Sequence, residues 1–303
     1  MTTAMPAERR KDKKLIDTSA AIMGSAPEGD DIAFLHSTFC QVGLPRSKPK
    51  TNIFERRSGT AAIRLEAGAL WNGAEYVQQH LPYGTKPRLL LLHLIRTYLR
   101  TGDRSVDLGS SLRDFLDTLN IDSSGGKRGG MTGFKEQIKA FAACRMVIGY
   151  NTSTGAARTR PAERIVEEFE AWPELGGVGG QRTLWPGSLL ISSEFASSIE
   201  KASVPLDARA IQAIQDSALA LDLYAWLAHR LTRLNAPTTL HWMSLREQFG
   251  QEIADPRNFK KNFVKALRDV LQVYPHAKVQ DVFGGIRIYP SLPPVPRKLI
   301  AVG

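Results

Sequence analysis

The sequence predicts an α+β protein built from two tandem winged-helix domains related by an internal repeat, each a helical bundle with a small antiparallel sheet. Residues 239–289 read in order as a short strand, a short helix that starts at Ser244, a long helix and a hairpin that turns at Gly284-Gly285. A comparable order of elements begins about 130 residues upstream. The length of 303 residues also suits about two domains.

The composition indicates a polyanionic partner. Lys and Arg number 40 against 30 Asp and Glu, which gives a net charge of +10 and an isoelectric point near 9.7. Such a balance favours nucleic acid or an anionic membrane surface. No run of about 18 apolar residues occurs, so no membrane-spanning segment is expected. No secretory signal is evident, and the two cysteines are expected to be free thiols in a reducing cytoplasm.

Residues 1–30 are predicted to form a disordered basic arm, because they lack a periodic apolar pattern. A tail that adds phosphate contacts is the functional alternative. Residues 31–172 are assigned to the N-terminal winged-helix domain, in which residues 31–42 suit a short helix.

The next elements are expected to be strands followed by a helix. Asn72-Gly73 lies between apolar runs and is a strong hairpin signal, with strands predicted over residues 60–66 and 75–79. Pro87 opens a helix over residues 88–100, and Gly102 ends it.

The first copy of the repeat follows. It is predicted as a strand over residues 105–108, a short helix from residue 111, a glycine-rich turn, a second helix around Phe134, and a hairpin that pairs residues 146–150 with 164–169. Its DNA-binding candidates are Lys127, Arg128, Thr132, Lys135 and Lys139. Because Glu136 lies among them, this copy is expected to bind DNA more weakly or to share its role with dimerisation.

A Gly- and Pro-rich stretch marks the predicted boundary, with a linker over residues 173–187, a C-terminal winged-helix domain over 188–294 and a tail over 295–303. This domain is expected to begin with a strand over residues 188–191 and a helix over 193–201. A long helix then runs from its cap at Asp207 to Leu234. Its apolar stripe is interpreted as core, with a partner helix as the alternative.

The helix over residues 256–274 carries the functional prediction. Asp255 caps it, Pro256 opens it, and Phe259 and Phe263 begin its core face. The DNA-binding candidates are its outward residues and one hairpin residue: Arg257, Asn258, Lys260, Lys261, Lys265, Arg268 and Arg287. The alternative is an ordinary amphipathic helix whose solvated face is basic.

No catalytic motif is recognised. The sequence lacks a phosphate-binding loop, a His-x-His pair, a Cys-x-x-Cys motif and a His-Glu-x-x-His motif. We therefore expect no enzymatic activity, no cofactor and no metal. A nicking relaxase is disfavoured because that chemistry needs a metal-binding histidine pair.

Several segments resemble a known family. They are Phe34-Leu35-His36-Ser37, Leu44-Pro45-Arg46, Leu81-Pro82-Tyr83-Gly84-Thr85-Lys86-Pro87-Arg88, Gly125-Gly126-Lys127-Arg128-Gly129-Gly130, Leu184-Trp185-Pro186-Gly187, Ala220-Leu221-Asp222-Leu223-Tyr224-Ala225-Trp226-Leu227-Ala228-His229-Arg230-Leu231 and Leu245-Arg246-Glu247-Gln248-Phe249-Gly250. Over residues 31–294 the chain resembles the plasmid-encoded RepA replication initiators. The resemblance implies a protein that binds repeated sequences at a plasmid origin, opens the duplex and recruits host replication proteins. A winged-helix transcriptional repressor is the alternative, and a homodimer through the N-terminal domain is left open.

Overall fold

The chain folds into two units whose boundaries differ from the predicted ones. The computed structural model describes residues 7–109, 112–119, 130–151, 157–169 and 188–296. One unit, here the split unit, combines Met1–Gln41 with Ser203–Gly303, and the other, here the inserted unit, is Val42–Ala202. The predicted domain 31–172 therefore includes residues 31–41 of the split unit, and the predicted domain 188–294 includes residues 188–202 of the inserted unit. The predicted linker at 173–187 lies outside the described residues.

The start of the chain is a helix, where a disordered arm was predicted for residues 1–30. Helix α1 spans Ala7–Gly24. Leu15 is 1% exposed, Lys14 Nζ donates to the Gln212 carbonyl oxygen at 2.7 Å, and Lys11 pairs with Asp269. The prediction failed because the apolar contact that orders this basic segment comes from residues distant in the sequence.

The segment predicted as one helix over residues 31–42 divides into a strand and a short helix of equal length. It contains a 3-10 turn η1 (Gly29–Asp31), strand β1 (Ile32–His36) and helix α2 (Ser37–Gln41). Strand β1 pairs antiparallel with β11 (Ser203–Asp207), with Ile32 opposite Asp207 and His36 opposite Ser203. Residues 31–41 belong to the split unit for this reason.

The helix predicted to run from Asp207 to Leu234 is interrupted. Asp207 is the N-cap as predicted, and its Oδ1 accepts from Arg209 N at 2.9 Å. Helix α7 (Ala208–Ile214) then ends, and α8 (Ala218–Leu231) begins with its own cap, because Ser217 Oγ accepts from Ala220 N. Trp226 and Leu227 of α8 are buried, as expected for a core stripe.

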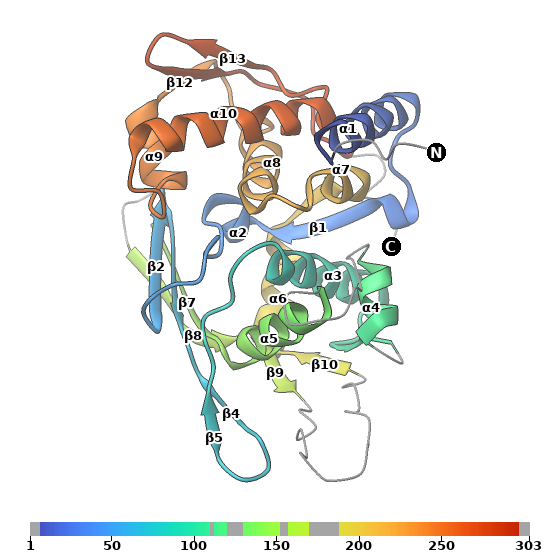
Figure 1. Cartoon of the computed structure of the whole chain (residues 1–303), viewed down its shortest axis with the longest axis vertical. Helices are drawn as coiled ribbons and strands as arrows, with labels where there is room; N and C mark the ends of the chain where they lie inside the picture. The colour runs from blue at the N-terminus through green and yellow to red at the C-terminus, as the bar shows by residue number, and fades with distance from the viewer. Residues whose placement is uncertain (1–6, 110–111, 120–129, 152–156, 170–187, 297–303) are drawn as a thin grey trace. The chain divides into compact units, whose positions relative to one another are not determined.

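The remaining elements of the split unit follow the predicted order. They are β12 (Thr238–His241), α9 (Trp242–Phe249), α10 (Pro256–Val273), β13 (Val279–Val282) and β14 (Gly285–Ile288). The strands form an antiparallel sheet in the order β12-β14-β13, and Figure 1 shows it beside α10. Two details differ from prediction: α9 begins after His241 rather than Ser244, and the turn is Phe283-Gly284 rather than Gly284-Gly285.

The inserted unit contains the other strands and helices. They are β2 (Ile53–Ser58), β3 (Ala61–Glu66), β4 (Ala69–Trp71), β5 (Tyr76–Gln78), α3 (Lys86–Thr101), β6 (Ser105–Asp107), α4 (Leu112–Thr118), α5 (Gly130–Ala143), β7 (Arg145–Asn151), β8 (Ala157–Arg164), β9 (Val166–Phe169), β10 (Ser188–Ile191) and α6 (Ser193–Ala202). Gly102 ends α3 in the left-handed region at φ +71°, as predicted.

Several strands of the inserted unit pair differently from prediction. The Asn72-Gly73 hairpin joins β4 to β5, whereas β3 pairs with β2 and β7. Strand β7 pairs with β8, from Arg145 opposite Arg164 to Asn151 opposite Ala157, and residues 165–169 are not its partners. Strand β9 pairs with β10, which the sequence analysis had placed in the other domain. Period-two alternation predicts strands but does not identify their partners.

The two units share one arrangement of elements. In the inserted unit β6, α4 and α5 precede β9 and β10, and the sheet order is β6-β10-β9. In the split unit β12, α9 and α10 precede β13 and β14, and the order β12-β14-β13 is again first, last, middle. The β7–β8 hairpin is an addition in the inserted unit, where it completes the sheet β2-β3-β7-β8. Among the described helices, none has the length and apolar character to cross a membrane.

Candidate nucleic-acid interface

The position of helix α10 is fixed by its N-terminal cap and by its buried apolar face. Asp255 Oδ1 accepts from Arg257 N at 2.8 Å, and Pro256 occupies the first turn. Phe259, Phe263 and Val270 are at most 1% exposed. Because this face is fixed in the core, the opposite face of α10 is also fixed, and it points to solvent.

The outward face of α10 is cationic. The predicted residues are all exposed: Arg257, Asn258, Lys260, Lys261, Lys265 and Arg268. Asn262 and Gln272, which the sequence analysis did not single out, are exposed as well. The acidic residue of α10, Asp269, is buried and pairs with Lys11 of α1. Its charge therefore does not oppose the positive potential of the outer face.

Trp242 links α9 to this face, and the sequence analysis did not identify it. The Lys260 ammonium lies 4.9 Å from the centre of the Trp242 ring, a cation–π distance. The same ring meets Phe263 edge to face at 5.7 Å between centroids. Trp242 thus joins the core of the unit to one of the candidate cations.

Arg287 lies on the central strand of the hairpin sheet. It is exposed, and its neighbours Ile286 and Ile288 are buried, because successive side chains of a strand point to opposite faces. Arg287 lies opposite Gln280 of β13 and Thr239 of β12. The hairpin therefore presents a cation on its solvent face.

The corresponding helix of the inserted unit, α5, presents less charge. Lys127 and Arg128 lie outside the described residues, as does the side chain of Thr132. Lys135 and Lys139 are only partly exposed, while Glu136 is exposed. Gln137 is buried, and its Oε1 accepts from Tyr83 N at 2.8 Å. Helix α5 packs against α3 and β9. This geometry agrees with the expectation of weaker DNA binding by the first copy, which stays a prediction.

Two buried arginines of the inserted unit have a structural role. Arg88 donates to the carbonyl oxygens of Pro45 at 3.0 Å, Gly84 at 2.6 Å and Leu44 at 2.6 Å. Arg56 donates to the Leu44 carbonyl at 3.2 Å. The segments 44–46 and 81–88, which carry much of the family resemblance, therefore meet through Arg88 and fix each other's backbone.

Burial shifts the pKa values of titratable groups in the interior. Burial lowers the pKa of His93 to about 4, and burial likewise raises the pKa of the Cys144 thiol to about 12. Cys40 and Cys144 are both free and buried, as expected. In the described ranges no three His, Cys, Asp or Glu side chains gather to hold a metal.

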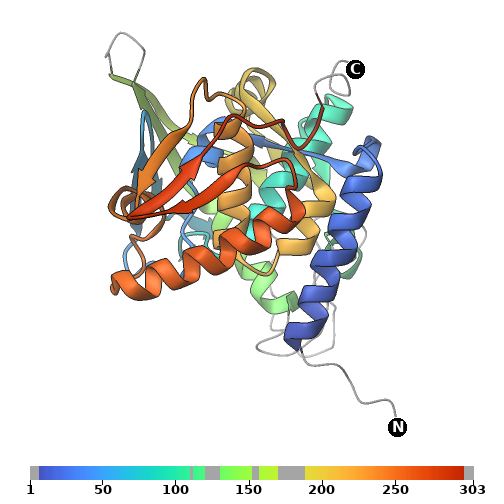
Figure 2. The ribbon, with the colours of Figure 1, turned by 90° about the horizontal axis from the view of Figure 1, so that it is seen from above.

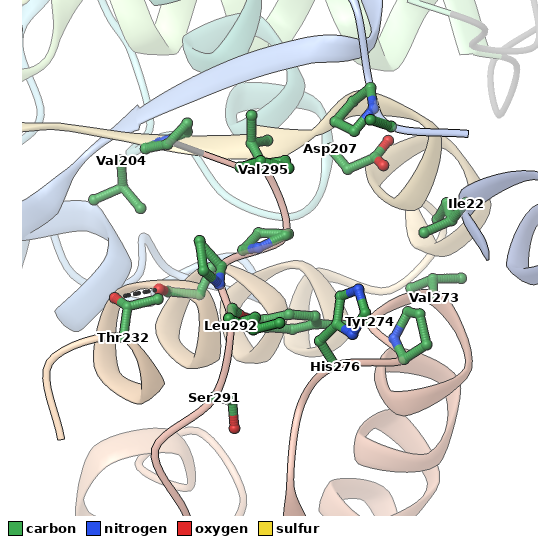
Figure 3. A pocket seen from close by; sticks show the side chains of 18 of the residues that line it. Ile22, Val204, Asp207, Thr232, Val273, Tyr274, His276, Ser291, Leu292 and Val295 are labelled. Carbon is green, nitrogen blue, oxygen red and sulfur yellow. Dashed lines mark hydrogen bonds between the residues drawn. The ribbon is translucent and has the colours of Figure 1, made fainter. Parts of the chain in front are cut away.

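A cavity of about 870 Å³ lies in the split unit, away from the outer face of α10. Ile22, Val204, Val273 and Leu292 line it (Figure 3). Two of its polar groups are engaged within the protein: Asp207 binds Arg209, and the Tyr274 hydroxyl donates to the Leu292 carbonyl at 2.8 Å.

Known proteins resemble this chain in sequence family and in fold. A family model described as "Plasmid encoded RepA protein" matches residues 81–243. A crystal structure of selenomethionine derivatives of domains 2 and 3 of RctB is similar with a TM-score of 0.52 and 12% identity, over 84% of this chain and 98% of that chain. A second crystal structure, of RctB domains 2-3 (RctB-155-483), has a TM-score of 0.47 and 12% identity, over 82% and 92%. No curated protein matches the sequence.

Proposed function

Because the chain belongs to the plasmid-encoded RepA family, we propose that it is a plasmid replication initiator that binds repeated sequences at the origin of its plasmid, helps to open the duplex and recruits host replication proteins. The observation that carries the proposal is the outer face of α10, where exposed cations stand opposite a face locked into the core. Such a protein acts where the plasmid is, in the bacterial cytoplasm, without a cofactor or a catalytic site of its own.

We propose that each unit contains a winged helix, with α10 as the recognition helix of the split unit. The order strand, helix, helix, hairpin and the shared sheet order support this assignment. Recognition helices place residues near their N-terminal end at base edges in the major groove. In this account Arg257, Asn258 and Lys261 read bases.

The other cations position the protein on the duplex. Lys260, Lys265 and Arg268 neutralise phosphates, which contributes affinity and register but little sequence information. Arg287 contacts the backbone or the minor groove as a wing residue. In the inserted unit Lys127, Arg128, Thr132, Lys135 and Lys139 provide weaker contacts, or that unit shares its role with dimerisation.

The test uses binding and replication together. Duplex sites are selected from a random pool with the full-length protein and then located in the DNA flanking the gene. The proposal expects direct repeats of the selected site beside an A·T-rich segment. It also expects a plasmid that carries this region as its sole origin to yield transformants with the wild-type gene but not with the Lys261→Ala gene.

The control is Lys201→Ala, which removes an exposed cation of α6 outside the proposed interface and should leave transformation intact. Selective DNA binding together with transformation that needs no functional gene would instead support a repressor. Failure to select any site would contradict DNA recognition itself.

A further inference from the structure

The tip of the β13–β14 hairpin carries a large apolar side chain in full contact with solvent. Phe283 occupies the two-residue turn between Val282 and Gly285 and is fully exposed. Burying a phenylalanine ring stabilises a folded protein, and Phe283 contributes nothing of this kind to its own unit. Phe259 and Phe263 of α10, in contrast, are completely buried.

Backbone contacts to α9 and β12 fix the position of the tip, and Phe283 lies outside the core. Gly284 has φ +81°, a conformation that other residues rarely adopt. Its carbonyl oxygen accepts from Trp242 N at 3.0 Å. At Gly285 an added Cβ would lie 1.9 Å from the Leu240 carbonyl oxygen, which shows how closely the β12 backbone approaches the tip.

The tip adjoins the cationic surface of the same unit. The backbone N–H of Trp242 donates to the Gly284 carbonyl, and the ring of Trp242 makes the cation–π contact with the Lys260 ammonium. Arg287 is exposed on the strand that leaves the tip. Figure 2 shows the hairpin turn at the same end of the split unit as the first residues of α10. An exposed aromatic ring close to cations fits a polyanion with apolar interior surfaces, which is what stacked base pairs offer.

We propose that Phe283 is a wedge that enters the minor groove next to the site read by α10 and partly unstacks a base step. The proposal rests on the proposed function, and it names the residue that begins to distort the duplex. Apolar wedges in the minor groove separate base pairs and kink DNA, and flexible pyrimidine–purine steps such as TA resist least. Phe283 performs this step by contact alone, without nucleotide hydrolysis.

The test measures unstacking separately from binding. Duplexes that carry the selected site, with 2-aminopurine at successive positions beside it, are titrated with full-length wild type, Phe283→Ala and Phe283→Leu. Wild type should raise the fluorescence at one step. Phe283→Ala should abolish that rise and weaken binding on the order of tenfold, while the apolar Phe283→Leu should restore part of both.

The matched control is Tyr76→Ala, which removes another exposed aromatic ring, from the β5 strand of the inserted unit, and should change neither readout. Because Phe283 carries no charge, its replacement should also leave the salt dependence of binding unchanged. Circular dichroism confirms that each variant is folded.

The outcomes separate this inference from the proposed function. Wild type that binds the site without any fluorescence rise would overturn the wedge and leave the initiator proposal standing. A folded Phe283→Ala protein that unstacks the step as wild type does would have the same consequence. Wild type that binds no duplex would overturn both.

Discussion

Arg88 and Arg56 are buried side chains that donate to backbone carbonyls of residues 43–45. Replacing Arg88 by Met keeps much of the volume but leaves buried carbonyl oxygens without their donor, and each such loss costs roughly 1–3 kcal/mol. We therefore expect Arg88→Met to lower the free energy of unfolding by at least about 2 kcal/mol in urea titrations. Arg57→Met is the control, because Arg57 is exposed one residue from Arg56, and it should change stability by less than about 0.5 kcal/mol.

His93 predicts a pH dependence of stability. Its ring packs edge to face on Phe115 at 5.1 Å, and burial, followed by the nearby charge of Arg96, lowers its pKa from 6.5 to about 4. Between these two values the unfolded chain binds a proton that the folded chain does not, so stability is present above pH 6.5 and is lost as the pH falls towards 4.

The measurement for His93 compares two proteins across this pH window. The free energy of unfolding of His93→Gln should fall less steeply between pH 6.5 and 4 than that of wild type, because glutamine does not titrate. The difference between the two curves removes the contribution of all other groups. Parallel curves would show that folding does not lower the pKa of His93.

Sequence reasoning found the candidate cations but not Arg88, Arg56 or Trp242. Charge and periodicity show that Lys261 faces away from the core. Arg88 in a helix and Arg56 in a strand look like ordinary surface residues. The carbonyl oxygens that they contact belong to residues 43–45, and no local pattern connects that segment to either arginine. Trp242 could have been noticed as an aromatic residue at the start of α9, but its contact with Lys260 depends on how α9 crosses α10.

At the scale of elements, both α10 and α5 were predicted as helices, but only the exposed face of α10 was predicted correctly. The cap, the proline and the apolar spacing of α10 are local, and the structure contains all three. For α5 the same spacing indicated an outer face, yet Lys135 and Lys139 are partly covered. A periodic pattern identifies one buried face but cannot show that neighbouring elements cover others.

The charged face of α10 predicts the salt dependence of binding. If Lys260, Lys265, Arg268 and Arg287 each neutralise one phosphate, the slope of log affinity against log salt should be about −4, which is a loss of roughly 10²-fold between 50 and 200 mM salt. Replacing Lys265 or Arg268 by Ala should reduce the slope by about one, and Lys201→Ala should leave it unchanged. A nearly flat response of wild type would refute the phosphate contacts.

At the scale of the whole molecule, the order of elements was predictable but the division into units was not. Strand β1 comes from the start of the chain and pairs with β11, which follows the entire inserted unit. A boundary read from Gly- and Pro-rich composition assumes that each unit is continuous, and the split unit is not. For the same reason β10 and α6 were assigned to the wrong unit.

This division predicts which fragments fold. A fragment of residues 188–294 lacks α1, which contributes the buried Leu15, and β1, which pairs with β11. We therefore expect this fragment to show no cooperative thermal transition by circular dichroism. Residues 7–41 joined to 203–296 through a Gly-Ser linker should melt cooperatively and bind the selected site. Equal stability of the two proteins would contradict the split unit.

The account rests on α10 as the element that reads DNA, and competition binding tests this most directly. Asn258→Ala, Lys261→Ala and Arg268→Ala are each titrated against the selected site and a scrambled site, with circular dichroism to confirm folding. Loss of about 1–3 kcal/mol against the selected site alone is expected for Asn258→Ala and Lys261→Ala. Arg268→Ala, two turns further along, should weaken both sites about equally. Folded Asn258→Ala and Lys261→Ala proteins that discriminate between the two sites as well as wild type would contradict the account.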